Sequence, residues 1–329
     1  MSLVGTMVGR YRVLRLLGEG GMARVFVAED TTVGRHVAIK ALLPEYSAHA
    51  TILERFMNEA KAMGRIQHPG VIDVFDVTLA PSGELCIIME LLTGQTLREQ
   101  LWKSGPFSVP DALPLMHQLA DTLAAAHAHR IVHRDLKPEN IFVVPDAMGG
   151  LRLKVLDFGI AKVMDAENVK TATTAQMGTA TYMAPEQFRS AKLVDHRADI
   201  YAVGCLFFEM LTGKPPFGGR NLFEQMNAHL TQPIPLERLP PTLPPHVRDL
   251  IGRMLVKDRD QRLGSLLEAT AVLSGTPLPA APAPMPRQAA PRRPDATSPV
   301  VRKTDRSWIW ALLAIVLVGA GVALTIALT

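Results

Sequence analysis

The chain has 329 residues, of which 48% are hydrophobic, so it is long enough for one large or two medium domains with a sizeable core. Its net charge of +4 arises entirely between residues 276 and 307, where six basic residues outnumber two acidic ones. The first 275 residues are therefore almost neutral, which excludes a strongly basic nucleic-acid-binding domain and predicts no nucleic-acid partner. Cys86 and Cys205 lie in apolar runs, which predict buried thiols rather than a disulfide or a metal site.

The amino-terminal region predicts short strands around a glycine-rich turn. Residues 1–9 lack a charged stretch followed by a long apolar run, so we expect no secretory signal peptide. Strand-like patterns cover residues 11–14, 18–27 and 36–40. The glycines of the first turn would let backbone N–H groups approach phosphate oxygens. A turn of this kind is weak evidence alone, because most such turns only reverse the chain.

A lysine and a glutamate follow this turn at a suggestive spacing. Lys40 ends the third predicted strand, and Glu59 lies 19 positions later, at the edge of the apolar stripe of a helix predicted over residues 52–65. Taken singly, Lys40 is most simply a solvated lysine, and Glu59 a surface partner of Arg55. Taken together, they predict an ion pair that fixes Lys40 against phosphate groups.

The middle of the chain predicts a hinge, a long helix and a hairpin. A buried strand over residues 85–92 leads to a hinge at Thr93 and Gly94. Ser108 and Asp111 resemble a capping box and open a helix that continues to about Arg130. Residues 141–144 and 152–156 predict a hairpin, and helices are expected over residues 199–211, 221–230, 246–255 and 265–273, between proline-rich turns.

Residues 133–140, with the sequence HRDLKPEN, contain the types of residue that phosphoryl transfer requires. Asp135 is a base for a hydroxyl group, Lys137 is a cation for phosphate oxygens, and Asn140 offers an amide oxygen to a metal ion. Asp157 stands 22 residues after Asp135, at the end of the predicted hairpin, and supplies a second metal ligand. Any one of these residues could belong to a solvated loop, but the ordered set predicts a phosphoryl-transfer site.

This ordered set resembles the eukaryotic-like Ser/Thr protein kinase family, particularly its bacterial membrane-bound members, over residues 11–274. The resemblance implies an α+β, bilobal protein-kinase fold, with a small β-rich N-lobe carrying one helix (about 11–92) and a larger helical C-lobe (about 93–274). It also implies a non-specific serine/threonine protein kinase that uses ATP and Mg²⁺, with Mn²⁺ as an alternative, to phosphorylate protein substrates.

The resemblance further implies a role for each motif residue. Asp135 would orient the substrate hydroxyl and accept its proton, Lys137 would steady the γ-phosphate, and Asn140 and Asp157 would hold Mg²⁺. Met89 would be the gatekeeper, with Glu90 and Leu92 giving backbone hydrogen bonds to adenine. The implied ATP site comprises Leu17, Gly18, Glu19, Gly20, Gly21, Val25, Ala38, Lys40, Glu59, Met89, Glu90, Leu92, Phe142 and Asp157. Structural support would come from the ion pair of Glu186 with Arg262, and from Asp199, which would brace the catalytic loop.

One position departs from the family pattern. Ala23 replaces the third glycine of the loop, which restricts the backbone there and removes a positive φ angle. We expect a modest effect on nucleotide affinity, because Gly18 and Gly20 are retained. An Ala23→Gly variant would show it as a changed KM for ATP.

Residues 161–181 are polar and rich in threonine, a composition that by itself predicts only a mobile surface loop. By resemblance, Arg134 would bind a phosphate group on this loop and so order it. Thr171 and Thr173 are the expected autophosphorylation sites, and Thr179 would contact Asp135 and the substrate pocket. Modification of Thr171 or Thr173 is expected to raise activity.

The carboxyl end predicts a membrane anchor. Residues 275–307 form a Pro/Arg-rich disordered linker, and residues 308–328 carry no charge and would span about 31 Å as a helix, close to the thickness of a bilayer core. The basic linker predicts contact with membrane lipids and a single-pass orientation in the inner membrane, with the kinase cytoplasmic, the C-terminus outside and no extracellular sensor domain. Ala311, Gly319, Ala323 and Ala327 form a small-residue stripe compatible with a homodimer.

Two alternatives differ in class from a protein kinase. A membrane-tethered pseudokinase scaffold would share the fold, but it need not retain Lys40, Asp135, Asn140 and Asp157 together. A small-molecule phosphotransferase on a related fold is disfavoured by the segment Ala184-Pro185-Glu186 and by the threonine-rich loop, which belong to kinases of protein substrates.

Overall fold

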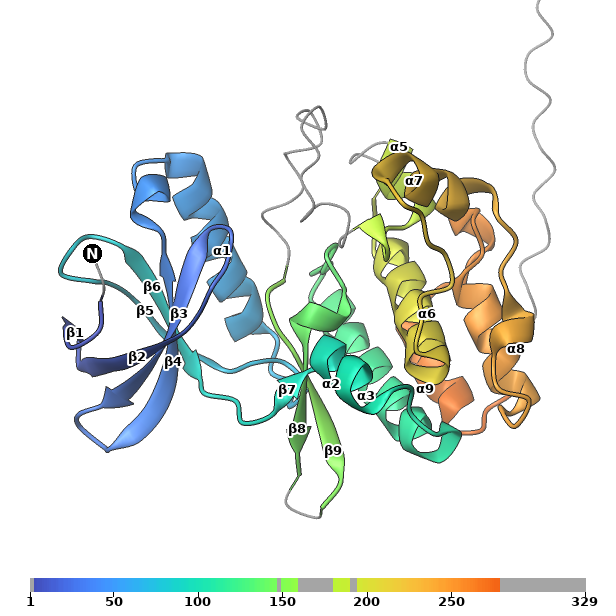
Figure 1. The fold of residues 1–329 in the computed structure, drawn as a ribbon, viewed down its shortest axis with the longest axis horizontal. Coiled ribbons are helices and arrows are strands. Elements are labelled where there is room, and N and C mark those ends of the chain that lie inside the picture. The colour runs from blue at the N-terminus through green and yellow to red at the C-terminus, as the bar shows by residue number, and fades with distance from the viewer. Residues whose placement is uncertain (1–2, 147–148, 159–179, 190–193, 279–329) are drawn as a thin grey trace, which may run out of the picture. The chain divides into compact units, whose positions relative to one another are not determined.

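The computed structural model describes residues 3–146, 149–158, 180–189 and 194–278. Its amino-terminal lobe is an antiparallel sheet with the strand order β1-β2-β3-β4-β6-β5 (Figure 1). The strands are β1 (Met7–Val8), β2 (Tyr11–Glu19), β3 (Ala23–Asp30), β4 (Arg35–Leu42), β5 (Val74–Leu79) and β6 (Leu85–Glu90). Apolar residues on one side of the sheet, among them Tyr11, Phe26 and Ile88, form a buried cluster that holds the strands together.

Helix α1 (Ala50–Arg65) packs beside this sheet (Figure 1). Its residues Phe56 and Ala60 are buried against Leu42 of β4 and Ile87 of β6. A short 3-10 helix, η1 (Pro44–Tyr46), connects β4 to α1. This packing fixes the rotation of α1, so that Glu59 points towards the lobe interior and not to solvent.

A second, three-stranded sheet follows, in the order β7-β8-β9. Its strands are β7 (Gln95–Thr96), β8 (Ile141–Pro145) and β9 (Leu151–Val155), and the 3-10 helix η2 (Pro138–Asn140) directly precedes β8. Gly94, the predicted hinge residue, has φ +152°, and a Cβ atom there would lie 2.2 Å from the carbonyl oxygen of Val143. Only glycine permits this close approach of the two backbones.

The carboxyl-terminal lobe is mostly helical. Its helices are α2 (Leu97–Ser104), α3 (Val109–Ala128), α5 (Pro185–Arg189), α6 (Arg197–Thr212), α7 (Leu222–Thr231), α8 (Pro245–Met254) and α9 (Leu266–Leu273), with the short 3-10 helices η5 (Leu236–Arg238) and η6 (Arg259–Gln261). Helix α6 is buried on every side and contacts both α3 and α8 (Figure 1). A helix that is apolar all round belongs inside a lobe, so the two carboxylates that α6 carries, Asp199 and Glu209, need partners.

The β-rich N-lobe and helical C-lobe confirm the predicted lobe architecture. The sequence analysis missed β5 and α2. Helix α2 is short and buries only Leu97 and Leu101, so its apolar periodicity is weak, although Thr96 and Glu99 form a full capping box. The described lobe also starts before residue 11, because Leu3 and Val8 are buried in the same cluster as Tyr11.

The membrane anchor predicted from the sequence is not among the described residues. Within the described residues, no helix has the length and apolar character needed to cross a membrane. The linker over residues 275–307 is outside those residues beyond Leu278, and so is the whole of the span predicted over residues 308–328.

Candidate active site

Lys40 joins three separate parts of the fold at one point. Its Nζ atom lies 2.7 Å from Oε1 of Glu59 on α1 and 2.7 Å from Oδ1 of Asp157, which follows β9. The side chains of Lys40 and Glu59 are only 13% and 10% exposed. The structure therefore forms the ion pair predicted for these two residues and adds a second carboxylate to it.

Burial and mutual charge set the ionisation of this cluster. Burial, reinforced by the like charge of Asp157, raises the pKa of the Glu59 carboxyl to about 7 although Lys40 opposes this rise. Burial disfavours the charge on Lys40, but Asp157 and Glu59 outweigh it and raise the pKa of this ammonium group above its ordinary value. Burial likewise works against ionisation of Asp157, yet Lys40 holds the pKa of this carboxyl below its usual range. Lys40 and Asp157 are thus charged at neutral pH, and Glu59 titrates near it.

The residues of the HRDLKPEN segment converge around Asp135. Nδ2 of Asn140 donates to the carbonyl oxygen of Asp135 at 2.8 Å and lies 3.4 Å from its Oδ2. Nζ of Lys137 is 3.5 Å from the same Oδ2. The predicted base, cation and amide oxygen therefore share one small region. Its connection to Asp157 is direct, because the N–H of Leu156 donates to the carbonyl oxygen of Asn140 at 2.8 Å.

Asp199 of α6 binds the backbone of this segment. Its two carboxylate oxygens accept hydrogen bonds from the backbone N–H groups of His133 and Arg134, each at 2.8 Å. Oδ2 also lies 2.8 Å from Nε2 of His127. Burial opposes the charge of Asp199, but these donors hold the pKa of its carboxyl below its ordinary value. The bracing carboxylate predicted at position 199 thus binds the catalytic loop directly.

Backbone strain marks two of the site residues. Arg134 has φ +64° and Asp157 has φ +38°, in the left-handed region that side chains other than glycine rarely adopt. Such conformations persist only where surrounding contacts fix them, and they cluster at functional sites. The bond from Arg134 N–H to Asp199 supplies one such contact, and the bond from Lys40 to Asp157 supplies the other.

Packing links the catalytic loop to the segment of Asp157. The ring of His133 lies 4.8 Å from the ring of Phe158, and its Nε2 atom is 3.0 Å from the carbonyl oxygen of Leu156. Phe158 is fully buried in the core of the larger lobe. The contact between His133 and Phe158 therefore helps to fix the position of Asp135 relative to Asp157.

The predicted adenine site is apolar where the two lobes meet. Ala38 and Met89 are buried in the main core cluster, and Val25 and Leu92 pack against it. Phe142 is half-buried on β8, whereas Leu17 on β2 is exposed. The structure adds one detail to the backbone hydrogen bond predicted at Glu90. Its N–H already donates to the carbonyl oxygen of Asp73 at 2.9 Å, so only the carbonyl group of Glu90 is left to bind adenine.

The glycine-rich segment comprises Gly18 and Glu19 at the end of β2 and Gly20 and Gly21 in the turn before β3. None of its glycines has a positive φ angle, and a Cβ atom at Gly18 or Gly21 would meet no atom within 4 Å. Within the described residues, nothing in the fold requires glycine at these two places. A close approach by a ligand to the backbone would require it, which fits a phosphate-binding loop.

The position of Ala23 in the fold bears on the restriction of the loop that the sequence predicted. It begins β3, pairs with Leu42 of β4, and buries its methyl group beside Phe56. An extended strand position needs no positive φ angle, so the expected restriction of the loop by Ala23 does not follow from its place in the fold. The methyl group instead contributes to the contact between the sheet and α1.

The predicted regulatory residues are only partly described. Thr171, Thr173 and Thr179 lie outside the described residues. Arg134 is described, and its Nε atom is buried without a hydrogen-bond partner among the described residues. A buried guanidinium nitrogen without a partner is costly, which suits a residue that binds an anion.

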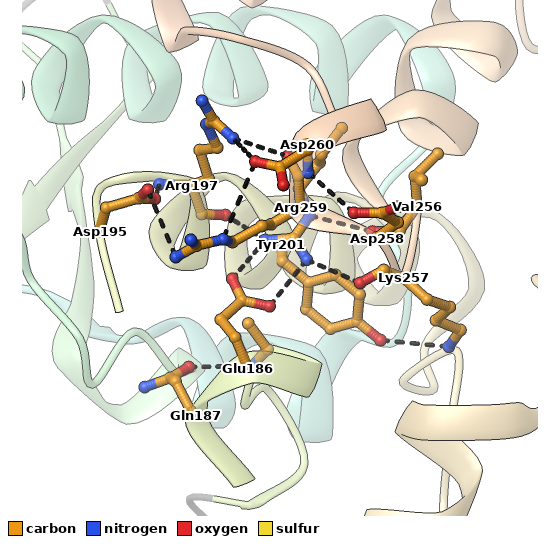
Figure 2. Close-up of polar contacts among 12 residues, drawn as sticks. Glu186, Gln187, Asp195, Arg197, Tyr201, Val256, Lys257, Asp258, Arg259 and Asp260 are labelled. Atoms are coloured by element: carbon orange, nitrogen blue, oxygen red, sulfur yellow. Dashed lines mark hydrogen bonds and ion pairs between the residues drawn. The ribbon is translucent and has the colours of Figure 1, made fainter. Parts of the chain in front are cut away.

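Glu186 and Arg262 form the predicted buried ion pair. Nη1 and Nη2 of Arg262 donate to the two carboxylate oxygens of Glu186 at 2.7 and 2.9 Å. Figure 2 shows Glu186 pointing into a polar network whose members include Tyr201, Arg259 and Arg197. The bidentate geometry ties α5 to the segment that follows α8.

Three residues with functional contacts escaped the sequence analysis: Arg98, His127 and Lys154. Nζ of Lys154 on β9 donates to Oε1 of Glu90 at 2.5 Å and to the carbonyl oxygen of Val71 at 3.1 Å, so it joins the hinge to the strand before Asp157. Only the three-dimensional contacts reveal these residues, because each lies in an ordinary helix or strand pattern. The HAHR sequence ending the long helix was the one local hint for His127.

The oxygen atoms of Asn140 and Asp157 fit a hard divalent cation such as Mg²⁺. Nδ2 of Asn140 is used within the loop, which leaves its Oδ1 as the metal-facing atom. The described residues contain no group of three or more His, Cys, Asp and Glu side chains that could hold a metal ion. Two protein oxygens suffice where phosphate oxygens of a nucleotide complete the coordination, as is usual for Mg²⁺.

Comparisons with known proteins agree with this geometry. Residues 11–274 match the family described as the protein kinase domain. The chain is 41% identical to the serine/threonine-protein kinase pkn2 of Myxococcus xanthus over 81% of its own length and 32% of that protein. It is 39% identical to the serine/threonine-protein kinase PknA of Mycobacterium tuberculosis, covering 87% of this chain and 67% of PknA. For the serine/threonine-protein kinase PrkC of Bacillus subtilis, the identity is 38%, over 78% of this chain and 39% of PrkC.

These relatives are longer than the region they share with this chain, which spans about a third of pkn2 and about two thirds of PknA. The region that matches the family model, residues 11–274, contains every motif of the candidate site, from the glycine-rich segment to Arg262. The chain therefore belongs to the protein kinase family, among the bacterial kinases of the eukaryotic-like serine/threonine type.

Proposed function

We propose that this chain is an ATP-dependent serine/threonine protein kinase that transfers the γ-phosphoryl group of ATP to protein hydroxyl groups. The observation that carries the proposal is the contact of Lys40 with both Glu59 and Asp157 at 2.7 Å, beside the cluster of Asp135, Lys137 and Asn140. A pseudokinase scaffold would not need this complete assembly. A kinase requires all of it, because catalysis of phosphoryl transfer consists mainly of positioning and charge stabilisation.

The N-lobe residues bind and orient the nucleotide. Ala38, Val25 and Met89 provide an apolar surface for adenine, and the carbonyl group of Glu90 and the N–H of Leu92 fix its edge. The glycine-rich turn lies over the phosphates, and the ammonium group of Lys40 binds the α- and β-phosphates. Glu59 and Asp157 hold Lys40 in place from two sides, so the cation is positioned before ATP arrives.

The C-lobe residues act on the acceptor. The Asp135 carboxylate accepts a hydrogen bond from the substrate hydroxyl and takes its proton as the oxygen–phosphorus bond forms and the bond to the β-phosphate oxygen breaks. Lys137, 3.5 Å from Asp135, offsets negative charge on the γ-phosphate. When bound, Mg²⁺ or Mn²⁺ neutralises phosphate charge, and Asn140 and Asp157 are the residues that would hold it.

A phosphoryl-transfer assay tests this function. The purified full chain and an Asp135→Asn variant are compared with labelled ATP and a mixture of Ser- and Thr-containing peptides. We expect the variant to lose about 10²-fold or more of the transfer rate, because it lacks the base, while it still binds nucleotide. Equal transfer by the two proteins would refute the kinase function and leave the pseudokinase scaffold.

Autophosphorylation at Thr171 or Thr173 is the regulation we propose. The support is the buried Nε atom of Arg134, which lacks a partner among the described residues and directly precedes the base. A phosphothreonine would satisfy this guanidinium group and so couple the threonine-rich loop to Asp135. Mass spectrometry of the active enzyme should find phosphate on one of the two threonines, and the Thr171→Ala/Thr173→Ala variant should be less active. An active enzyme modified at neither site contradicts the proposal.

Attachment to the inner membrane is the location we propose, with the kinase lobes in the cytoplasm and a single span over residues 308–328. The support is the uncharged run of these residues after a basic linker that would contact anionic lipids. The full chain should sediment with membranes after carbonate washing, whereas a chain ending at residue 307 should not.

A homodimer through the small-residue stripe should be weakened by Gly319→Leu in a membrane association assay, and an unchanged signal would count against the dimer.

A further inference from the structure

Gln187 of helix α5 uses both ends of its side-chain amide, each on a different segment of the chain. Its Oε1 atom accepts a hydrogen bond from the backbone N–H of Ala184 at 2.8 Å, and its Nε2 atom donates to the backbone carbonyl oxygen of Arg134 at 3.1 Å. Because a backbone N–H can only donate and a carbonyl oxygen can only accept, these partners fix which end of the amide faces which segment. Gln187 therefore joins the segment before α5 to the catalytic loop.

The position of Gln187 is itself fixed by the contacts of α5. The neighbouring residue, Glu186, is bound by both ends of the Arg262 guanidinium group, which anchors the helix (Figure 2). The backbone N–H of Gln187 also donates to the carbonyl oxygen of Ala184 at 2.9 Å, so Ala184 binds both the backbone and the side chain of Gln187. The amide group is thus held in place before it meets the catalytic loop.

The carbonyl group of Arg134 belongs to the peptide unit that leads directly into Asp135. The other end of this unit, the N–H of Asp135, donates to Nδ1 of His133 at 3.3 Å. Arg134 has the strained φ angle of +64°, and its own N–H donates to Asp199 at 2.8 Å. A strained residue keeps its conformation only where surrounding contacts fix it. Asp199 fixes the peptide unit before Arg134, and Gln187 fixes the unit after it.

The segment that Gln187 binds lies beside the predicted base. Tyr182 and Met183 line one small cavity together with Gln187 and Asp135. The N–H of Met183 donates to the carbonyl oxygen of Ala180 at 3.3 Å, so the segment forms a turn at this place. A change in the shape of this turn would therefore reach Asp135 through the amide of Gln187.

We propose that Gln187 is a positioning residue for phosphoryl transfer. It holds the peptide unit before Asp135 in the orientation from which this carboxylate meets the substrate hydroxyl, and it ties that orientation to residues 180–184. The inference rests on the proposed kinase function and assigns a role to a residue that this function does not use. The expected effect is large, because a displacement of about 1 Å in a reacting group can cost about 10²-fold in rate.

A structural role limited to α5 gives different consequences. In that role only the hydrogen bond to Ala184 matters, because it connects the helix to the turn before it. The variant Gln187→Glu separates the two roles. Its carboxylate still accepts from the N–H of Ala184, but it places a second oxygen against the carbonyl oxygen of Arg134, where a donor is needed.

Steady-state kinetics of the full chain with ATP and one serine peptide test the proposal. We expect Gln187→Glu to lower kcat about tenfold and to change the KM for ATP by less than about twofold, since the nucleotide site keeps its residues. Gln187→Met, which can bind neither partner, should lower kcat at least as much and replaces Gln187→Glu if that variant folds poorly. The control Gln67→Glu makes the same exchange at an exposed position and should leave kcat unchanged.

A second measurement places the effect at the base. In single-turnover reactions, adding Gln187→Glu to Asp135→Asn should lower the residual rate by less than about twofold, because the group that Gln187 positions is already lost. A loss of about tenfold in both backgrounds would overturn the proposal, and so would a wild-type kcat in Gln187→Glu and Gln187→Met.

Hydrogen exchange of single amides separates failure of this inference from failure of the kinase function. In Gln187→Glu, the amides of Arg134 and Asp135 should exchange about tenfold faster than in the wild type, while the amide of Ala184, which keeps its acceptor, should not change. If no protein transfers phosphate but these two amides exchange faster, the connection through Gln187 exists and the kinase function fails. If phosphate is transferred and both kcat and exchange are unchanged, the kinase function stands and the role of Gln187 is refuted.

Discussion

Glu59 and Asp157 share the single ammonium group of Lys40, and burial, together with the charge of Asp157, makes Glu59 sensitive to pH. A carboxylate that is buried beside a second carboxylate gains less from one cation than it would gain alone. The pKa of Glu59 is accordingly about 7 in the folded protein, compared with an ordinary value of 4.5. The same residue that fixes Lys40 is thus the one that takes up a proton near neutral pH.

A Glu59→Gln variant tests this ionisation through stability. Because the pKa is higher in the folded than in the unfolded state, the contribution of Glu59 is fully present below pH 4.5 and is lost as the pH rises through about 7. The Tm of the wild type, without nucleotide, should therefore fall relative to that of Glu59→Gln between these two pH values. A Tm difference that is independent of pH would contradict the raised pKa.

Asp199 is the second residue on which the site depends, because its carboxylate accepts from two consecutive backbone N–H groups, one of them in a strained residue. In Asp199→Asn, an NH₂ group replaces one of the two carboxylate oxygens. A backbone N–H group of the catalytic loop then meets a donor in place of its acceptor. We expect the free energy of unfolding to fall by about 1–3 kcal/mol. We expect kcat to fall about tenfold or more while the KM for ATP changes little, since the catalytic loop and not the nucleotide site is displaced.

The control for Asp199→Asn is Glu224→Gln, which removes a charge from an exposed ion pair on α7. Its effect on the free energy of unfolding should stay within about 0.5 kcal/mol. Urea unfolding and steady-state kinetics measure both variants. An Asp199→Asn variant with wild-type kcat would show that the catalytic loop keeps its shape without this carboxylate.

At the scale of elements, strand β9 connects the hinge to the active site. Lys154 on β9 contacts Glu90 at the end of β6 and the segment before β5, and its strand ends two residues before Asp157. The backbone adds to this connection, because Val155 accepts from Ile72 and donates to Gly70. The hinge, the segment between α1 and β5, and Asp157 are therefore positioned by the same strand.

A double-mutant cycle with Lys154→Met and Glu90→Gln measures this connection. The two side chains are 15% and 17% exposed, so their ion pair is mostly shielded from solvent. We expect a coupling free energy of about 1–2 kcal/mol, more than a surface pair provides. Arg152→Met on the same strand, whose nearest acidic partner is 4.0 Å away and whose side chain is 63% exposed, should cost less than about 0.5 kcal/mol. Additive effects of the first two substitutions would show that the pair does not couple hinge and strand.

At the scale of the whole molecule, the C-lobe depends on the buried ion pair of Glu186 and Arg262. Arg262 is fully buried and uses both ends of its guanidinium fork on Glu186, while its remaining hydrogen bonds go to backbone carbonyl groups. The network in Figure 2 links α5, the start of α6 and the turn after α8. Its loss should weaken the entire lobe, since three elements lose their common contact.

Removing one partner of this ion pair should lower the free energy of unfolding more than removing both partners does. Arg262→Met leaves the Glu186 carboxylate buried without its cation, and we expect the free energy of unfolding to fall by about 3–5 kcal/mol. The double variant Glu186→Leu/Arg262→Met should recover part of this loss, because it leaves no uncompensated charge. Chemical unfolding of the three proteins checks the order. A double variant less stable than Arg262→Met would show that Glu186 has other essential partners.

The sequence by itself indicated the candidate site residues, and its resemblance to a known family indicated the lobe architecture. Asp135, Asn140 and Asp157 occur at spacings that belong to one chemistry, and the helices and strands follow from local apolar periodicity. Such features are readable because each depends on residues that are close together in the chain. The spacing of Lys40 and Glu59 was also informative, since only the short helix η1 separates β4 from α1, and the packing of α1 against the sheet turns Glu59 inward.

The tertiary structure alone decided which distant charges meet. Arg98 contacts residues 41, 84 and 111 positions away, and Lys154 contacts Glu90 across 64 positions. It also placed Ala23 in a strand, where the argument from backbone freedom does not apply. The physical reason is the same in each case: the energy of an ion pair or a buried methyl group depends on partners and burial, which folding determines and which local sequence does not contain.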